Sequence, residues 1–153
     1  AEAIGLTSID MLAGVDRVPE ELKPKLKARL RHVLSECGRV KRAAKAIEMR
    51  EWKDLGSLMN QSHASLRDDY EVSCPELDTI VSLAQGQKGV LGARLTGAGF
   101  GGCAIALCQE NSLQSWQEEV EEAYREVFGY TPNIFEANFS QGVKLTLLSS
   151  ASN

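Results

Sequence analysis

The sequence lacks the clustered cysteines and histidines of a structural metal site. Its 153 residues include four cysteines, none of them in a C-x-x-C pair, and only two histidines, His32 and His63. We therefore expect no bound metal within the chain. Because the scattered thiols also form no disulfide framework, we expect reduced cysteines and a cytoplasmic protein.

Long apolar runs are missing as well. No stretch approaches the roughly 20 apolar residues of a membrane span, and no positively charged leader precedes an apolar segment. Hydrophobic residues make up 43% and charged residues 25% of the chain, as in an ordinary soluble domain rather than a disordered or collagen-like chain. We expect residues 1–153 to form one domain with no membrane partner.

The charge is not strongly of one sign, with a net value of −4, but it is unevenly distributed. Residues 20–51 contain ten basic and five acidic side chains, with no interleaved aromatic residue. A solvated helix face explains this pattern better than a nucleic-acid surface does. We therefore expect no nucleic-acid partner.

Periodicity predicts three helices in the first half of the chain. Residues 1–20 predict no regular element. Beyond Glu20, apolar residues recur at steps of three and four and predict one buried helix face, made of Leu26, Leu30, Val33, Leu34, Cys37, Val40, Ala44 and Ile47. A second helix is predicted from Trp52 to about Leu66. A third is predicted from Pro75 through Ala84, with Pro75 in its first turn.

Strands dominate the second half. Residues 90–96 alternate as a strand does, and residues 103–108 are apolar on both faces, which predicts a central strand. Asn111 or Ser112 is expected to cap a helix that ends near Gly129, with a core face of Leu113, Trp116, Val120, Tyr124 and Val127.

The last part of the chain predicts a β-hairpin. Residues 135–139 and 143–147 alternate in hydrophobicity around the turn Ser140-Gln141-Gly142. The order of all elements then predicts an α+β fold, in which helices pack on one face of a mainly antiparallel four-stranded sheet.

The stretch "GARLTGAGFGGC", residues 92–103, joins the first two predicted strands through a glycine-rich loop. It satisfies G-x-G-x-x-G, but a dinucleotide-binding loop leads into a helix, whereas this one leads into a strand. It also lacks the Gly-Lys-Ser/Thr ending of a phosphate-binding Walker loop. Two interpretations remain: a flexible connection between strands, or a rigid loop whose missing side chains admit another backbone or a phosphate.

Two motifs in the same order resemble a known family. "GARLTGAGFGGC" resembles the third conserved motif of the GHMP small-molecule kinases, and "SLRDDYEVSCPELD", residues 65–78, resembles the stretch that distinguishes galactokinases among them. The resemblance covers roughly residue 31 to the C-terminus. It implies a ferredoxin-like GHMP kinase C-terminal domain.

That resemblance also implies a function. Galactokinases transfer the γ-phosphoryl group of ATP to galactose, and their N-terminal domain supplies the galactose pocket, the phosphate loop and the catalytic aspartate. We therefore expect no catalytic residue in this chain, with ATP and Mg²⁺ held mainly by an N-terminal domain that the sequence does not contain. The loop would support the ATP phosphates through Gly97, Ala98, Gly99, Phe100, Gly101 and Gly102. The alternatives are a kinase of N-acetylgalactosamine or another sugar, and a non-catalytic galactose and ATP sensor.

Several reactive side chains near these motifs are expected to be structural. Asp68 and Asp69 follow a predicted helix, where a cap or solvated turn is more common than a catalytic pair. His63 is expected to be a hydrogen-bonded or surface histidine rather than a ligand. Cys74 precedes a helix N-terminus, which favours a thiolate, but we expect it to pack structurally.

Overall fold

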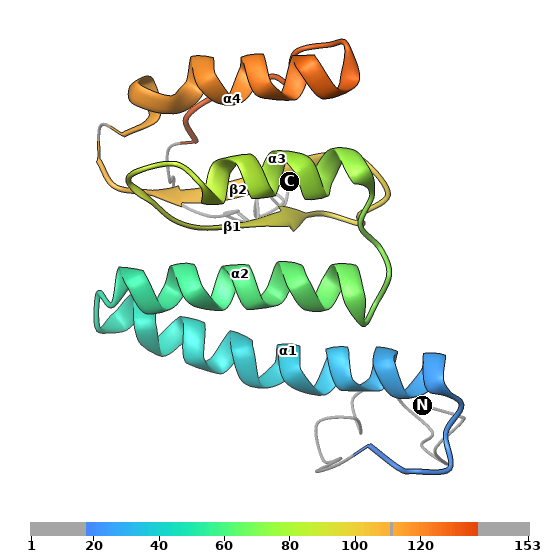
Figure 1. Cartoon of the computed structure of the whole chain (residues 1–153). Helices are drawn as coiled ribbons and strands as arrows, with labels where there is room; N and C mark the ends of the chain where they lie inside the picture. Colours follow the sequence, from blue (N-terminus) through green and yellow to red (C-terminus); the bar gives the residue numbers. More distant parts are fainter. Residues whose placement is uncertain (1–17, 111, 138–153) are drawn as a thin grey trace, which may run out of the picture.

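The structure, a computed structural model, describes residues 18–110 and 112–137. The predicted N-terminal segment therefore lies almost wholly outside the described residues. Six elements occur in the order that the sequence predicts (Figure 1): α1 (Pro24–Glu48), α2 (Trp52–Asp68), α3 (Pro75–Gln85), β1 (Val90–Thr96), β2 (Cys103–Cys108) and α4 (Leu113–Phe128).

Local sequence explains where several helices begin and end. Proline occupies the first turn of α1 and of α3, where its missing N–H costs no helical hydrogen bond. Helix α4 ends at Phe128 and is followed by Gly129, which adopts a left-handed φ of 77° while its N–H donates to the Arg125 carbonyl. Glycine adopts this conformation without a Cβ clash, so the chain turns there.

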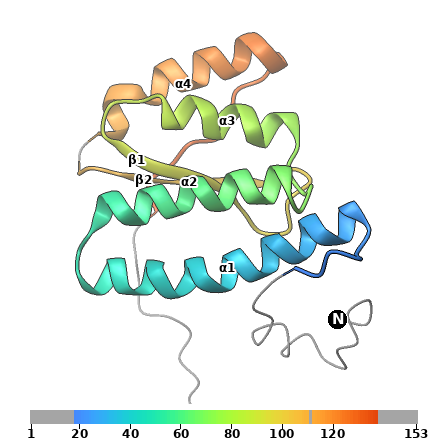
Figure 2. The same ribbon diagram turned by 60° about the horizontal axis from the view of Figure 1, so that its bottom comes forward.

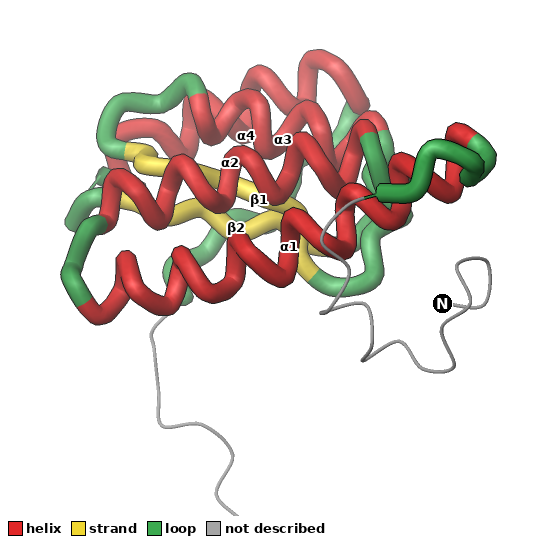
Figure 3. The backbone as a smooth tube through the Cα atoms, turned by 90° about the horizontal axis from the view of Figure 1, so that it is seen from below, coloured by secondary structure: helices red, strands yellow, loops and turns green. Residues whose placement is uncertain are grey.

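The two strands pair antiparallel, with Thr96 opposite Cys103 and Ala93 opposite Ala106. Figure 3 shows them as neighbours beside α2. Ala93 and Leu95, each 1% exposed, point to the same face of β1. Leu95 packs with Leu66 of α2 and Leu77 of α3, so the core lies between the strand and these two helices.

Helix α2 runs directly against the backbone of β1. A Cβ atom on Gly56 would lie 2.2 Å from the Leu91 carbonyl oxygen, and one on Gly92 would lie 2.1 Å from that of Gly56. Nearby, the Asn60 side-chain oxygen accepts the Ala93 N–H at 2.8 Å. These contacts close the edge of β1 that faces away from β2.

Helix α1 packs on the side of α2 away from the strands (Figure 1, Figure 2), and its predicted core face is largely wrong. Of that stripe, Leu30 is buried, but Val40 is 65% and Ile47 51% exposed. The helix instead turns His32 and Ala46 inward. The periodicity correctly marks an apolar stripe, but no described residue covers most of it.

The predicted central position of β2 is not seen in the described residues. Ile105 is 48% exposed, and Cys103 and Ala106 are exposed. Within residues 18–110 and 112–137 the sheet has two strands, and residues 135–137 are not in a strand. The rest of the predicted hairpin lies outside the described residues.

The predicted core face of α4 is confirmed at Trp116, Val120 and Tyr124, which are at most 5% exposed. It is wrong at Val127, which is 62% exposed close to the helix end. The described part is thus an α+β unit with four helices and an antiparallel strand pair.

Candidate functional site

The glycine-rich loop between β1 and β2 has an unusual backbone conformation. Positive φ angles occur at five of its six residues, namely Gly97, Gly99, Phe100, Gly101 and Gly102. Such angles are readily accessible to glycine, whereas they cost a residue with a Cβ roughly 1 kcal/mol or more. The path of the chain therefore favours glycine at these positions, and Phe100 adopts the strained conformation in spite of its Cβ.

One point of the loop is fixed to the segment that follows α2. The Phe100 N–H donates to the Val72 carbonyl at 2.8 Å. A Cβ on Gly99 would lie only 2.2 Å from that same carbonyl oxygen. Gly99 therefore permits the close approach. The Val72 carbonyl, which holds the loop at this point, is called the Val72 seat below.

The remainder of the loop is open. Cβ atoms on Gly97, Gly101 or Gly102 would meet nothing within 4 Å among the described residues, and Phe100 is 74% exposed. Among the N–H groups of residues 97–102, only that of Phe100 donates to a backbone carbonyl in the described part of the chain. The other N–H groups of the loop have no backbone acceptor among the described residues, and exposed backbone N–H groups of this kind can bind an anion.

The Val72 seat is itself held by the C-terminus of α2. The Val72 N–H donates to the Leu66 carbonyl at 3.1 Å, and Glu71 adopts a left-handed φ of 59° to turn the chain. The Tyr70 ring stacks on His32 of α1 with ring centroids 4.6 Å apart. Contacts with α1 and with the end of α2 therefore hold the segment on which the loop rests.

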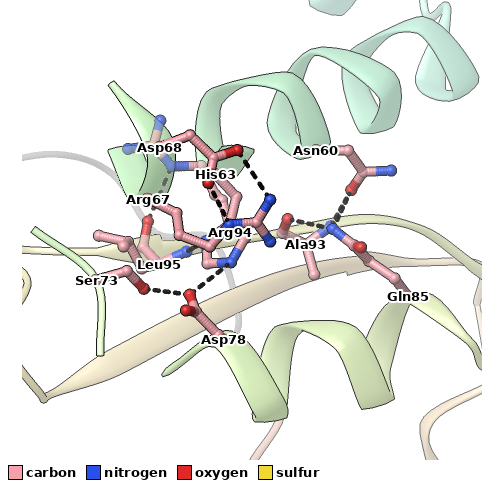
Figure 4. A network of polar contacts seen from close by, with 10 residues as sticks. All are labelled: Asn60, His63, Arg67, Asp68, Ser73, Asp78, Gln85, Ala93, Arg94 and Leu95. Atoms are coloured by element: carbon pink, nitrogen blue, oxygen red, sulfur yellow. Dashed lines mark hydrogen bonds and ion pairs between the residues drawn. The ribbon is translucent and has the colours of Figure 1, made fainter. Parts of the chain in front are cut away.

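The His63 side chain extends from α2 toward α3 and β1 (Figure 4). The Leu95 N–H donates to its Nδ1 at 3.3 Å, and its Nε2 lies 3.4 Å from the Asp78 carboxylate. Ser73 donates a hydrogen bond to the same carboxylate. Burial lowers the pKa of His63, although Asp78 acts in the opposite direction. The expected hydrogen-bonded role is confirmed.

The adjacent carboxylates at the end of α2 have separate partners. Asp68 pairs with Arg67 at 2.7 Å in an exposed position, and this hydrogen bond lowers the pKa of Asp68. Asp69 pairs with Arg31 at 2.8 Å and accepts a hydrogen bond from Ser65. Asp69 therefore links the end of α2 to α1, whereas Asp68 contacts only its exposed neighbour Arg67.

Cys74 also has the environment expected of a packing residue. It lies just before α3 and packs against the buried cluster of Leu66, Leu77 and Leu95. Its thiol is free.

The motif positions Ser73 and Asp78 were not singled out from the sequence as site residues. Their spacing across a helix N-terminus was the available signal.

The described residues do not enclose the loop. Two surface hollows, of about 360 and 340 Å³, lie along α1 and α2, and neither is lined by a residue of the glycine loop.

Two further features are absent from the described residues. None of the helices there combines the length and the hydrophobicity that a membrane span needs. Residues 18–110 and 112–137 contain no group of three or more His, Cys, Asp or Glu side chains placed to hold a metal ion.

The profile of the family described as "GHMP kinases C terminal" matches residues 43–126. The chain belongs to this GHMP kinase family. The match includes α2, the Val72 seat and the whole glycine loop, so both motifs that suggested the resemblance fall inside it.

Curated relatives narrow the comparison within the GHMP kinases. The galactokinase of Staphylococcus saprophyticus is 49% identical over 116 residues, which cover 76% of this chain and 30% of that protein. The galactokinase of Clostridium perfringens strain SM101 is 44% identical over 137 residues, 90% of this chain and 35% of that protein. The chain therefore spans about a third of the length of these relatives.

Solved GHMP kinase structures share the fold. The Lactococcus lactis galactokinase complexed with galactose has a TM-score of 0.69 and 50% identity, over 71% of this chain and 28% of that one. The structure of L. major mevalonate kinase in complex with R-mevalonate has a TM-score of 0.54 and 30% identity, over 65% of this chain and 29% of that one.

Proposed function

We propose that this chain is the C-terminal part of a galactokinase, which transfers the γ-phosphoryl group of ATP to galactose in the cytoplasm to give galactose 1-phosphate. The identity of 44% to 49% with galactokinases supports this assignment. The observation that carries it is the glycine loop, which is seated on Val72 on one side and open on the other.

In this proposal the loop supports ATP rather than performing chemistry. Gly97–Gly102 would border the ATP phosphates, where free N–H groups stabilise negative charge. Phosphoryl transfer depends largely on placing the acceptor and the γ-phosphate in line, so a rigid wall contributes without a reactive side chain.

Mg²⁺ would neutralise the phosphates. The described residues offer it no acidic cluster, so its ligands and the catalytic base are assigned to the upstream part of a longer protein.

The upstream part would also cover the apolar surface left open here. The exposed stripe of α1, including Val40 and Ile47, and the exposed Phe100 of the loop are apolar side chains that a second domain could bury. We assign these faces to contact with an N-terminal kinase domain. The residues of this chain would then form one wall of a cleft completed by that domain, with galactose and ATP bound between them.

We further propose that the sheet has four strands. Helix α2 closes the outer edge of β1 through Asn60, so the two segments of the predicted hairpin would extend the sheet beyond β2, with the first of these strands beginning after residue 137. Slow amide hydrogen exchange at alternate residues of both segments and of β2 would support this. Fast exchange throughout residues 135–147 would contradict it.

The function is tested by galactose-dependent ADP release from ATP and Mg²⁺, measured on the full-length gene product and on this 153-residue chain in parallel. We expect activity in the full-length protein alone. A full-length protein that phosphorylates N-acetylgalactosamine and not galactose would reassign the substrate. One that binds galactose and ATP without turnover would be a sensor, and activity of the short chain would contradict the two-domain assignment.

A further inference from the structure

The His63 imidazole contacts both parts of the structure that hold the glycine loop, namely the end of β1 and the segment that contains Val72. The first support is β1, whose last residue, Thr96, precedes the loop directly. Just before it, Leu95 donates its N–H to His63 Nδ1 at 3.3 Å. Since β1 enters the loop two residues later, this bond fixes the strand end from which the loop departs.

The second support is the segment that holds the tip of the loop. His63 Nε2 faces the Asp78 carboxylate at 3.4 Å, and Asp78 accepts a hydrogen bond from Ser73. Ser73 follows Val72, whose carbonyl accepts the Phe100 N–H. Contacts therefore run continuously from β1 through His63, Asp78 and Ser73 to the loop tip, and Figure 4 shows the part from Leu95 to Ser73, with His63 between Leu95 and Asp78.

The chemistry of this position calls for an imidazole. Because Nδ1 accepts a backbone N–H, the neutral ring must carry its proton on Nε2, which faces Asp78. His63 is 4% exposed, and Nε2 has no partner with full hydrogen-bond geometry in the described structure. A leucine would fill the volume but would leave the Leu95 N–H without an acceptor.

We propose that His63 is a positioning residue, which fixes the distance between the end of β1 and the Val72 seat and thereby sets the conformation of the glycine loop. The consequence for phosphoryl transfer rests on the proposed function. The conformation of the loop does not, because it is measurable in this chain without substrate.

The test is amide hydrogen exchange at Phe100, measured by NMR in the 153-residue chain carrying His63→Leu. The matched control is Asn60→Leu, which removes another α2 side-chain acceptor from a β1 amide, that of Ala93, but has no link to Asp78 or Ser73. We expect His63→Leu to accelerate exchange at Phe100 about tenfold, the effect of losing one buried hydrogen bond. Asn60→Leu should leave that amide near its original rate.

Two conservative variants separate a positioning role from simple core packing. His63→Asn keeps an acceptor near the position of Nδ1, so it should restore part of the protection at Phe100. Ser73→Ala removes the other link without touching the core, so it should also accelerate exchange there. Equal acceleration by His63→Leu and Asn60→Leu would overturn the proposal.

The experiment remains decisive if His63→Leu does not fold, because Ser73→Ala leaves the buried cluster intact. An unchanged Phe100 rate in Ser73→Ala would then overturn the proposal. In the unsubstituted chain, the ¹⁵N shifts of His63 should report a neutral ring protonated on Nε2, and a proton on Nδ1 would also overturn it. Absence of kinase activity in the full-length protein would reject the proposed function and leave these results unaffected.

Discussion

Glycines that look equivalent in the sequence differ sharply in what surrounds them. Gly97 and Gly99 have nearly the same φ, 82° and 83°. A side chain on Gly97 would meet no described atom within 4 Å, whereas one on Gly99 would overlap the Val72 carbonyl. The two positions therefore separate backbone strain from steric exclusion within a single loop.

We predict that Gly99→Ala destabilises the chain more than Gly97→Ala does. Gly97→Ala should cost roughly 1 kcal/mol for the left-handed conformation alone, while Gly99→Ala must also displace the loop from Val72. Urea unfolding of both variants checks the difference, and Phe100 amide exchange should accelerate strongly only in Gly99→Ala. Equal effects on stability and exchange would show that Val72 does not constrain the loop.

At Glu71 the informative change is to introduce a glycine rather than to remove one. Its φ of 59° is strained for a residue with a Cβ, and its ion pair with Lys25 at 3.0 Å is exposed. Since exposed pairs contribute little, we predict that Glu71→Gly stabilises the chain by up to about 1 kcal/mol. Thermal unfolding checks this, with Lys25→Ala as the control for the lost ion pair. A loss of stability larger than that of the control would contradict it.

At the scale of the elements, side chains close the outer edge of β1. The Asn60 oxygen accepts both the Ala93 N–H and a Gln85 N–H, and Gln85 also donates to the Ala93 carbonyl. Amide groups of α2 and α3 thus replace the neighbouring strand that a sheet edge otherwise recruits. Because Gly56 and Gly92 have no Cβ atom, α2 lies close enough to β1 for the Asn60 side chain to reach the strand.

We predict that Asn60→Ala lowers the free energy of unfolding by about 1–3 kcal/mol, because it leaves the Ala93 N–H unsatisfied. The matched control is Gln61→Ala, the next residue of the same helix, whose side chain donates only to Ser57 in an exposed contact. Denaturant titration of both variants checks the prediction. Comparable stability of the two variants would show that the hydrogen bond between Asn60 and the Ala93 N–H contributes nothing measurable.

At the scale of the whole molecule, both histidines are buried in polar connections between elements. Burial lowers the pKa of His32 and of His63. The unfolded chain therefore binds protons that the folded chain does not, so stability is complete above pH 6.5 and falls as the pH decreases below it.

We expect a loss of up to about 1.4 kcal/mol per pH unit for each histidine in this window. Urea unfolding between pH 7.5 and 5.5 checks the slope. His32→Gln should reduce it. Stability that is flat or rises on acidification would contradict the assignment of neutral buried rings.

The stripe of α1 that no described residue covers leads to a prediction about association. We expect the 153-residue chain to self-associate at high concentration through the exposed Val40 and Ile47. The double substitution Val40→Lys and Ile47→Lys should lower the weight-average mass in sedimentation equilibrium without lowering the melting temperature. The exposed Val127 of α4, changed to Lys, is the control. A fully monomeric chain would contradict the prediction.

The sequence by itself determined the described elements and the place of the loop. Proline in the first turns of α1 and α3, glycine after α4 and the periodicity of apolar residues are local signals, so they predict local structure. The glycine content marked the loop between the two strands, whereas the motif around Asp68 was identified by its resemblance to a kinase family.

Only the tertiary structure decided which faces are covered and which side chains meet. Periodicity placed Val40 and Ile47 on one face of α1, but a helix face is buried only when another surface packs on it. The link from Leu95 through His63 to Asp78 joins residues 15 to 32 positions apart. Hydrogen bonds between distant residues depend on how the elements pack, and no local pattern of the sequence records that arrangement.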